Sequence, residues 1–95
     1  MNLFNMDLNG DTLTIGFADP ASNDAIVKFV RANLPKSNGG PILKITGPCS
    51  LPVGAVIVHG YCHIYGAIAV YDPKLQKFII AITHNPDYAI GDMID

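Results

Sequence analysis

A run of 27 residues without Asp, Glu, Lys or Arg, from residue 45 to residue 71, most constrains the fold of this chain. The run is long enough to cross a bilayer, but Pro48, Pro52, several glycines and two histidines interrupt it. A membrane span requires about 20 consecutive apolar residues, so these interruptions favour a loop, a buried helix and a buried strand. We therefore expect no membrane-spanning helix.

The composition indicates that the chain cannot hide all of its apolar surface. A domain of 95 residues buries roughly 60–65 % of the surface that its unfolded chain exposes. With 49 % hydrophobic and only 15 % charged residues, the apolar surface exceeds what one small core covers. Because leftover apolar patches usually mark interfaces, we predict one domain, residues 1–95, that forms oligomers.

The charged residues exclude some partners and leave others open. The net charge is −2, so the chain has no overall basic field to attract DNA or long RNA. Six Lys and Arg residues can still bind a short anionic ligand if a few converge. Cys49 and Cys62 form no CxxC pair, and the N-terminus lacks a basic and then apolar signal, so a reducing, cytoplasmic setting is expected.

Polarity patterns predict the elements of the first half of the chain. Residues 2–17 alternate in polarity around Asn9-Gly10, which predicts a β-hairpin. Apolar residues at helical spacing predict a helix over residues 24–34, which Ser22 or Asn23 can cap. A loop and a short strand over residues 42–46 follow.

The second half begins with a helix that is apolar on nearly every face, predicted over residues 51–65. Ser50 can cap it, and Pro52 lies in its first turn, where proline costs little. A strand over residues 66–71, a turn, a strand over residues 77–83 and a polar tail from His84 complete the chain. The order ββαβαββ predicts an α+β fold of the ferredoxin-like kind, with helices packed on one face of the sheet.

Histidines near the end of the second helix are the first candidates for chemistry. His59 and His63 are four residues apart, so they share one helix face and form a possible metal pair. No third ligand lies near them in the sequence, and for His59 a packed histidine bonded to the backbone is the simpler interpretation. His63 stands where the helix gives way to the strand, a position where functional side chains collect.

Polar residues also follow the apolar strand. Asp72 ends it and precedes Pro73, a pairing that is common in turns, so Asp72 is either a turn former or a catalytic acid. Lys74 is either a solvated turn residue or a cation for a ligand. His84 falls at the opposite edge of the sheet, so it meets Asp72 only if the sheet bends strongly or another subunit supplies it.

The loop before the second helix is a candidate for binding phosphate. Gly47, Pro48, Cys49 and Ser50 lead into the helix N-terminus, where free N–H groups and the helix dipole favour anions. The loop lacks a GxxxxGK pattern, so simple capping of the helix is the alternative interpretation.

Three segments together, "GPCSLP", "HIYGAIAVYDPKL" and "THNPDYAIGDMID", resemble the small CRISPR-associated ring nucleases of type III antiviral systems. That family is also described as a manganese-dependent RNA deadenylating exonuclease. The most specific part is a His, eight residues, Asp-Pro-basic-Leu, a strand, a second His and Gly-Asp-hydrophobic-Ile. The resemblance runs from Lys44 to the C-terminus, and the first forty residues match only in their hairpin and helix layout.

The resemblance implies a tight homodimer, with two dimers clasping cyclic tetra-adenylate in a tetramer. It places His63, Asp72, Lys74 and His84 at active-site positions, with Gly47–Ser50 and His59 as ligand-binding candidates. Asp72 and His63 become candidate ligands for Mn²⁺, His63 the general acid or base, and Lys74 the cation that stabilises the phosphate. The family often has arginine where this chain has Lys74, and lysine lacks the bidentate fork.

The activity implied is a metal-dependent ribonuclease that opens cyclic tetra-adenylate and so switches off the antiviral signal. Three alternatives stay open at this point. The chain could bind and sequester the ring without cutting it, act as a 3′ exonuclease on linear adenylate-rich RNA, or serve as a dimerisation domain that binds no nucleotide.

Overall fold

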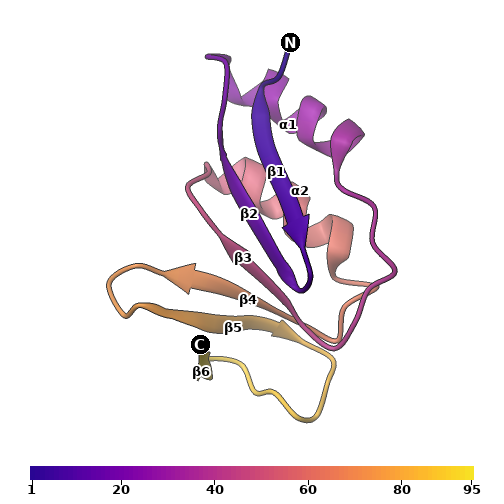
Figure 1. Ribbon diagram of the computed structural model, residues 1–95, viewed down its shortest axis with the longest axis vertical. Coiled ribbons are helices and arrows are strands. Elements are labelled where there is room, and N and C mark those ends of the chain that lie inside the picture. The colour runs from indigo at the N-terminus through magenta and orange to yellow at the C-terminus, as the bar shows by residue number, and fades with distance from the viewer.

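The computed structural model describes all residues 1–95 and shows a six-stranded mixed sheet with two helices on one of its faces (Figure 1). The strands are β1 Phe4–Asn9, β2 Thr12–Phe17, β3 Leu43–Thr46, β4 Ala67–Asp72, β5 Lys77–Thr83 and β6 Met93–Ile94. The helices are α1 Asn23–Asn33 and α2 Leu51–Tyr61. The predicted α+β class and the ββαβαββ order are confirmed, and a sixth strand is added.

Neighbours in the sheet are neighbours in the chain, in the order β1-β2-β3-β4-β5-β6. β1 and β2 form the predicted antiparallel hairpin, as do β4 and β5. β2, β3 and β4 run parallel, with α1 and α2 as the crossovers that parallel pairing requires. The carboxyl ends of these three strands therefore lie at one edge of the sheet, and their starts lie at the other.

The main core lies between the helices and the sheet. Each helix turns its apolar stripe inward, with Val30 of α1 and Ile57 of α2 both 0 % exposed. The buried members of this core share that face: Phe4, Leu13, Ile15, Ile26, Val30, Leu43, Ile45, Val53, Ile57, Tyr61, Tyr65 and Ile68. This packing fixes where β4 begins and ends, and so positions the polar residues at its two ends.

A second, smaller core lies on the opposite face of β4 and β5. It contains Ile42, Ala67, Ala69 and Ile80, against which Tyr88 and Ile94 pack. The polar tail predicted after His84 is therefore wrong in part, because this segment folds back along β5 and ends in β6. The chain folds back because this face of β4 and β5 is not covered by a helix, and the returning segment buries its apolar side chains.

The second helix ends earlier than predicted, at Tyr61 instead of residue 65. The reason is tertiary pairing: Tyr65 forms a parallel bridge with Gly40, and the N–H of Gly40 donates to the carbonyl of Ile64. These contacts pull residues 62–66 out of the helix. His63 thus lies in a turn after α2, not on the helix itself.

Large apolar side chains stay on the surface, as the composition predicts. Leu51 of α2 is 91 % exposed, and Val70 of β4 and Leu75 of the following turn are also exposed. Neither helix combines the length and the apolar character that crossing a membrane requires. Oligomerisation through the exposed apolar surface remains a prediction.

Candidate functional site

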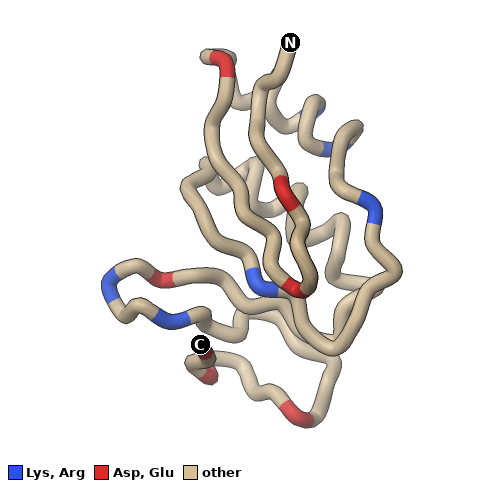
Figure 2. The backbone as a smooth tube through the Cα atoms, viewed as in Figure 1, with Lys and Arg blue, Asp and Glu red and all other residues tan.

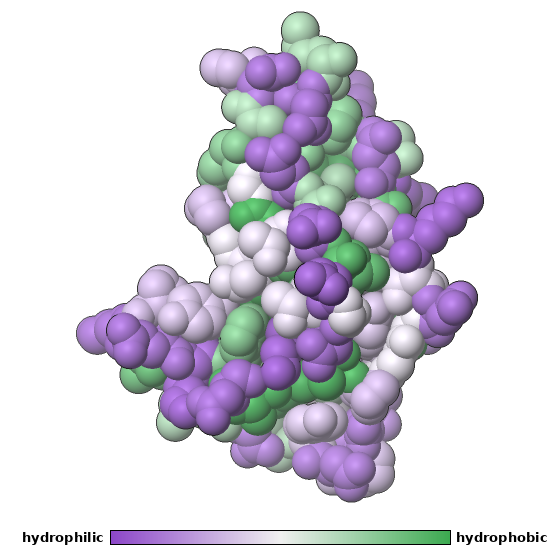
Figure 3. Space-filling model, in the orientation of Figure 1, coloured by the Kyte–Doolittle hydropathy of each residue, from purple (hydrophilic) through white to green (hydrophobic).

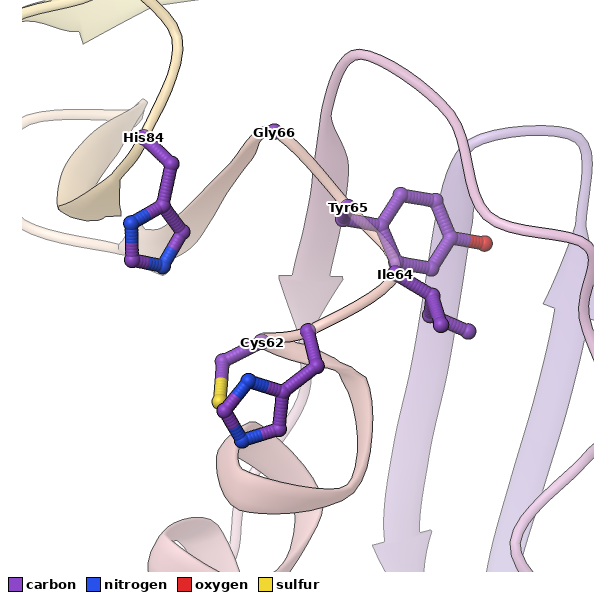
Figure 4. Close-up of a pocket in the computed structure, with 6 residues that line it drawn as sticks. Cys62, Ile64, Tyr65, Gly66 and His84 are labelled. Carbon is purple, nitrogen blue, oxygen red and sulfur yellow. The ribbon is translucent and has the colours of Figure 1, made fainter.

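Two of the predicted site residues, His63 and His84, line one pocket at the start of β4. Together with Cys62, Ile64, Tyr65 and Gly66 they line an open pocket of about 420 Å³ (Figure 4). Both imidazoles are exposed, and Figure 4 shows His84 on the same side of the chain as Cys62, with Tyr65 turned away. We call this pocket the histidine end.

Backbone contacts at Gly66 bring the segments that carry His63 and His84 to the same pocket. The N–H of His84 donates to the carbonyl of Gly66 at 2.7 Å, which ties the end of β5 to the turn before β4. A Cβ at residue 66 would lie 2.9 Å from the carbonyl oxygen of Pro41 and 3.2 Å from Cβ of Asn85. Glycine therefore permits a close approach of three segments that a larger residue would prevent.

Tyr65 anchors the same turn from the inside. It is 5 % exposed, its hydroxyl hydrogen-bonds Oγ of Ser37 at 2.6 Å, and its ring packs edge-on against Tyr61. The hydroxyl of Tyr61 in turn donates to the carbonyl of Pro35 at 2.6 Å. Since the turn is anchored on its buried side, His63 is presented on its solvent side.

His59 lies beside the histidine end rather than in it. Its ring is edge-on to that of His63, with ring centres 6.0 Å apart. The side chain is exposed and does not line the pocket. The interpretation of His59 as a packed histidine bonded to the backbone is therefore wrong, and its role in ligand binding remains a prediction.

Asp72 and Lys74 lie at the other end of β4, in the turn that joins it to β5. Oδ1 of Asp72 accepts the backbone N–H groups of Lys74 at 2.9 Å and Leu75 at 3.2 Å. The interpretation of Asp72 as a turn former is therefore confirmed. Because both hydrogen bonds use Oδ1, Oδ2 is left for other contacts. Lys74 is exposed and makes no ion pair, so its ammonium group can meet an anion.

The loop Gly47–Ser50 lies near this turn rather than near the histidines. An open cleft of about 530 Å³ is lined by the loop and the β4–β5 turn, through Thr46, Gly47, Pro48, Cys49, Tyr71 and Pro73. Oγ of Ser50 accepts the N–H of Val53, so the capping interpretation of the loop holds. Partial burial raises the pKa of the Cys49 thiol, which keeps it uncharged at neutral pH. We call this cleft with Asp72 and Lys74 the turn end.

The two ends are far apart within one subunit. Ala67, at the histidine end, and Asp72 are five residues apart on β4, which corresponds to about 17 Å at roughly 3.3 Å per residue. No three His, Cys or Asp side chains of the chain come close enough to hold a metal ion. Asp72 and His63 therefore cannot share Mn²⁺ in one subunit, and a shared ion requires two subunits.

The charges follow the same division (Figure 2). Lys74 and Lys77 lie on the β4–β5 hairpin beside Asp72, whereas no charged residue lines the histidine end. Lys77 is paired with Asp95 at the C-terminus, which leaves Lys74 as the unpaired cation of the turn. A phosphate group would thus meet the ammonium group of Lys74 at one end and only imidazole side chains at the other.

The cleft is also lined by Tyr71, Pro73 and Thr46, which no motif in the sequence marks as site residues. The available signal was position, because Tyr71 and Pro73 flank Asp72 and a strand end commonly carries functional residues. Cys62 was considered only as a free thiol, although it lines the histidine end.

The family of this chain follows from its similarity to a known family model. Residues 28–95, well over half of the chain, match the family model for CRISPR-associated protein (Cas_csx3). The chain belongs to the Cas_csx3 family. This confirms the resemblance to the small CRISPR-associated ring nucleases and extends it upstream from Lys44 to Lys28, within α1. No curated protein matches the chain.

Proposed function

We propose that this Cas_csx3 protein binds cyclic tetra-adenylate and cuts it, which ends the antiviral signal that the ring carries. The observation that best supports this proposal is the division of the four candidate active-site residues into two pairs. His63 and His84 line one pocket, and Asp72 and Lys74 stand beside another cleft at the opposite end of β4.

The division favours a site shared between subunits. Because about 17 Å separates the ends within one chain, the turn end of one subunit must face the histidine end of another to complete the site. A ring with several phosphates can span such a junction and hold the subunits together. The exposed apolar side chains of α2 and β4, such as Leu51 and Val70, supply further surface for the homodimer and tetramer.

Each residue has a role in this proposal that its surroundings permit. His63 and His84 are exposed imidazoles, and histidine is the side chain best suited to exchange protons near neutral pH. Lys74 places its charge on the scissile phosphate and stabilises the charge that develops there. Asp72 holds the backbone of Lys74 in the turn through Oδ1, and its Oδ2 is left for the ligand or a metal ion.

Mn²⁺ fits the donor set only when two subunits contribute. A carboxylate oxygen of Asp72 and an imidazole nitrogen of His63 are ligands that Mn²⁺ accepts, but one subunit does not bring them together. Such an ion, when bound, would supply charge stabilisation at the phosphate or an activated water. The alternative nucleophile is the ribose 2′-OH, activated by a histidine.

The test is incubation of internally radiolabelled cyclic tetra-adenylate with the protein, in Mn²⁺ and in EDTA. The proposal predicts linear products in Mn²⁺. A ring that is bound but recovered intact would favour the sequestering module, and a linear poly-adenylate tail shortened as fast as the ring opens would favour the exonuclease. Cleavage that is undiminished in EDTA would exclude a metal-activated water as the nucleophile.

A further inference from the structure

The residues that line the cleft at the turn end have no role in the proposed chemistry. The β4–β5 hairpin projects beyond the helices, and the space-filling view shows a notch between it and the loop after β3 (Figure 3). The cleft encloses about 530 Å³, within the range of small-molecule sites. None of its six lining residues carries a charge.

Tyr71 forms the aromatic wall of this cleft. Its ring packs against Phe78, its partner on β5, with ring centres 5.2 Å apart and planes at 66°. Nζ of Lys44 lies 5.8 Å from the centre of the Phe78 ring and adds a cation–π contact. Tyr71 is only partly buried although it is packed, so its ring is held in one orientation while part of it faces the cleft.

The position of Tyr71 ties this wall to the proposed chemistry. Asp72 follows it directly, and Pro73, which also lines the cleft, precedes Lys74. Apolar wall and charged group thus alternate along four consecutive residues. A ligand with a flat apolar part joined to a phosphate matches this alternation, because the flat part can lie on Tyr71 while Lys74 meets the phosphate.

We infer that the cleft receives one nucleobase of the ring, stacked on Tyr71 and bounded by Pro73 and the Gly47–Cys49 loop. Stacking on an aromatic side chain is how proteins commonly hold unpaired bases. The hydroxyl group of Thr46 has no hydrogen-bond partner in the chain and stays available to the edge of the base. Tyr71 is thus a positioning and specificity residue, and the inference rests on the proposed function.

The simpler explanation is that Tyr71 serves only the hairpin, as a cross-strand partner of Phe78. Tyr71→Leu separates the two explanations, since leucine keeps apolar packing against Phe78 but removes the flat ring. Tyr71→Phe keeps the ring and loses only the hydroxyl. Tyr88→Leu is the matched control, because Tyr88 packs on the second core and lies outside the cleft.

The experiment measures equilibrium binding of radiolabelled cyclic tetra-adenylate to these variants, each in a His84→Ala background that prevents turnover. We expect Tyr71→Leu to weaken binding about 10- to 100-fold, as loss of one base stack does, with Tyr71→Phe and Tyr88→Leu within about threefold of the background protein. Unchanged affinity of a folded Tyr71→Leu protein would overturn the stacking site and leave the proposed function standing.

A second measurement does not depend on the folding of any variant. Cyclic tetra-uridylate, whose bases stack more weakly, should bind the background protein at least about tenfold less tightly than the adenylate ring. Equal binding of the two rings would overturn the base site. Absence of binding to either ring would overturn the proposed function together with the inference.

Discussion

Asp72 combines two roles that substitution can separate: it forms the β4–β5 turn, and it stands in the proposed site. Asp72→Ala removes both hydrogen bonds from Oδ1 to the backbone N–H groups of Lys74 and Leu75. Asp72→Asn retains an oxygen that can accept them but carries no charge. The pair of variants therefore tests turn formation and chemistry independently.

The two hydrogen bonds set the size of the stability effect. Each contributes a net 0.5–1.5 kcal/mol, and in a solvated turn the lower half of that range applies, so Asp72→Ala should lose about 1–2 kcal/mol. For a domain of this size the melting temperature should fall by about 5–15 °C. Asp72→Asn should melt within about 2 °C of the unmodified protein, because both bonds persist.

Activity should respond differently. Because the proposed role of the carboxylate is to act on the ligand, Asp72→Asn should lower ring cleavage by about 10²-fold or more despite its intact turn. Thermal melting by circular dichroism and a discontinuous cleavage assay on the same preparations give both values. Cleavage by Asp72→Asn at the unmodified rate would reduce Asp72 to a turn former and refute its catalytic role.

Four other substitutions, one of them a control, test separate parts of the structure. Gly47→Ala should destabilise the protein by more than about 3 kcal/mol in urea unfolding, because φ is +121° and a Cβ would lie 1.9 Å from the carbonyl oxygen of Ile15. The control Gly10→Ala, at φ +64° with open space around it, should lower the free energy of unfolding by only about 1 kcal/mol. Equal losses in the two variants would contradict the steric argument. Burial, and to a lesser extent the neighbouring Tyr65, raises the pKa of Tyr61 from 10.0 to about 12. The neutral phenol therefore contributes its full stabilisation below pH 10, and, with solvent screening taken into account, the free energy of unfolding should fall by about 1–2 kcal/mol as the pH rises to about 12. Tyr61→Phe should flatten that part of the pH–stability curve, and an unchanged slope would show that the phenol titrates normally. Lys74→Arg should raise the cleavage rate severalfold, because a guanidinium group grips phosphate with two hydrogen bonds, and a lower rate than that of the unmodified protein would argue against a phosphate contact at this position.

Local patterns predicted most of the fold. Alternation around Asn9-Gly10 located the first hairpin, and the uncharged run located α2 and β4 because it is broken by Pro48, Pro52 and glycines. These features are set by residues near one another in the chain. The end of α2 and the strand β6 were not predictable in this way, since each depends on pairing with a distant segment, through Gly40 in one case and β5 in the other.

For the site, too, the features set by neighbouring residues were predictable, and those that depend on distant segments were not. The position of Asp72 in a turn followed from the Asp-Pro pair, and the separation of His84 from Asp72 followed from the order of the strands. That His63 and His84 line one pocket could not be predicted, because it depends on the close approach at Gly66. The cleft beside Tyr71 was equally inaccessible, since it arises from the outward course of the hairpin relative to the loop after β3.

The claim that two subunits complete each site is tested most directly by complementation. Asp72→Asn protein has an intact histidine end, and His84→Ala protein has an intact turn end. In an equal mixture that exchanges subunits, half of the turn ends and half of the histidine ends are intact. About a quarter of the sites at which the turn end of one subunit faces the histidine end of another should therefore combine two intact ends. We predict a cleavage rate near a quarter of that of the unmodified protein, whereas a mixture no more active than the sum of its two inactive components would contradict the shared site.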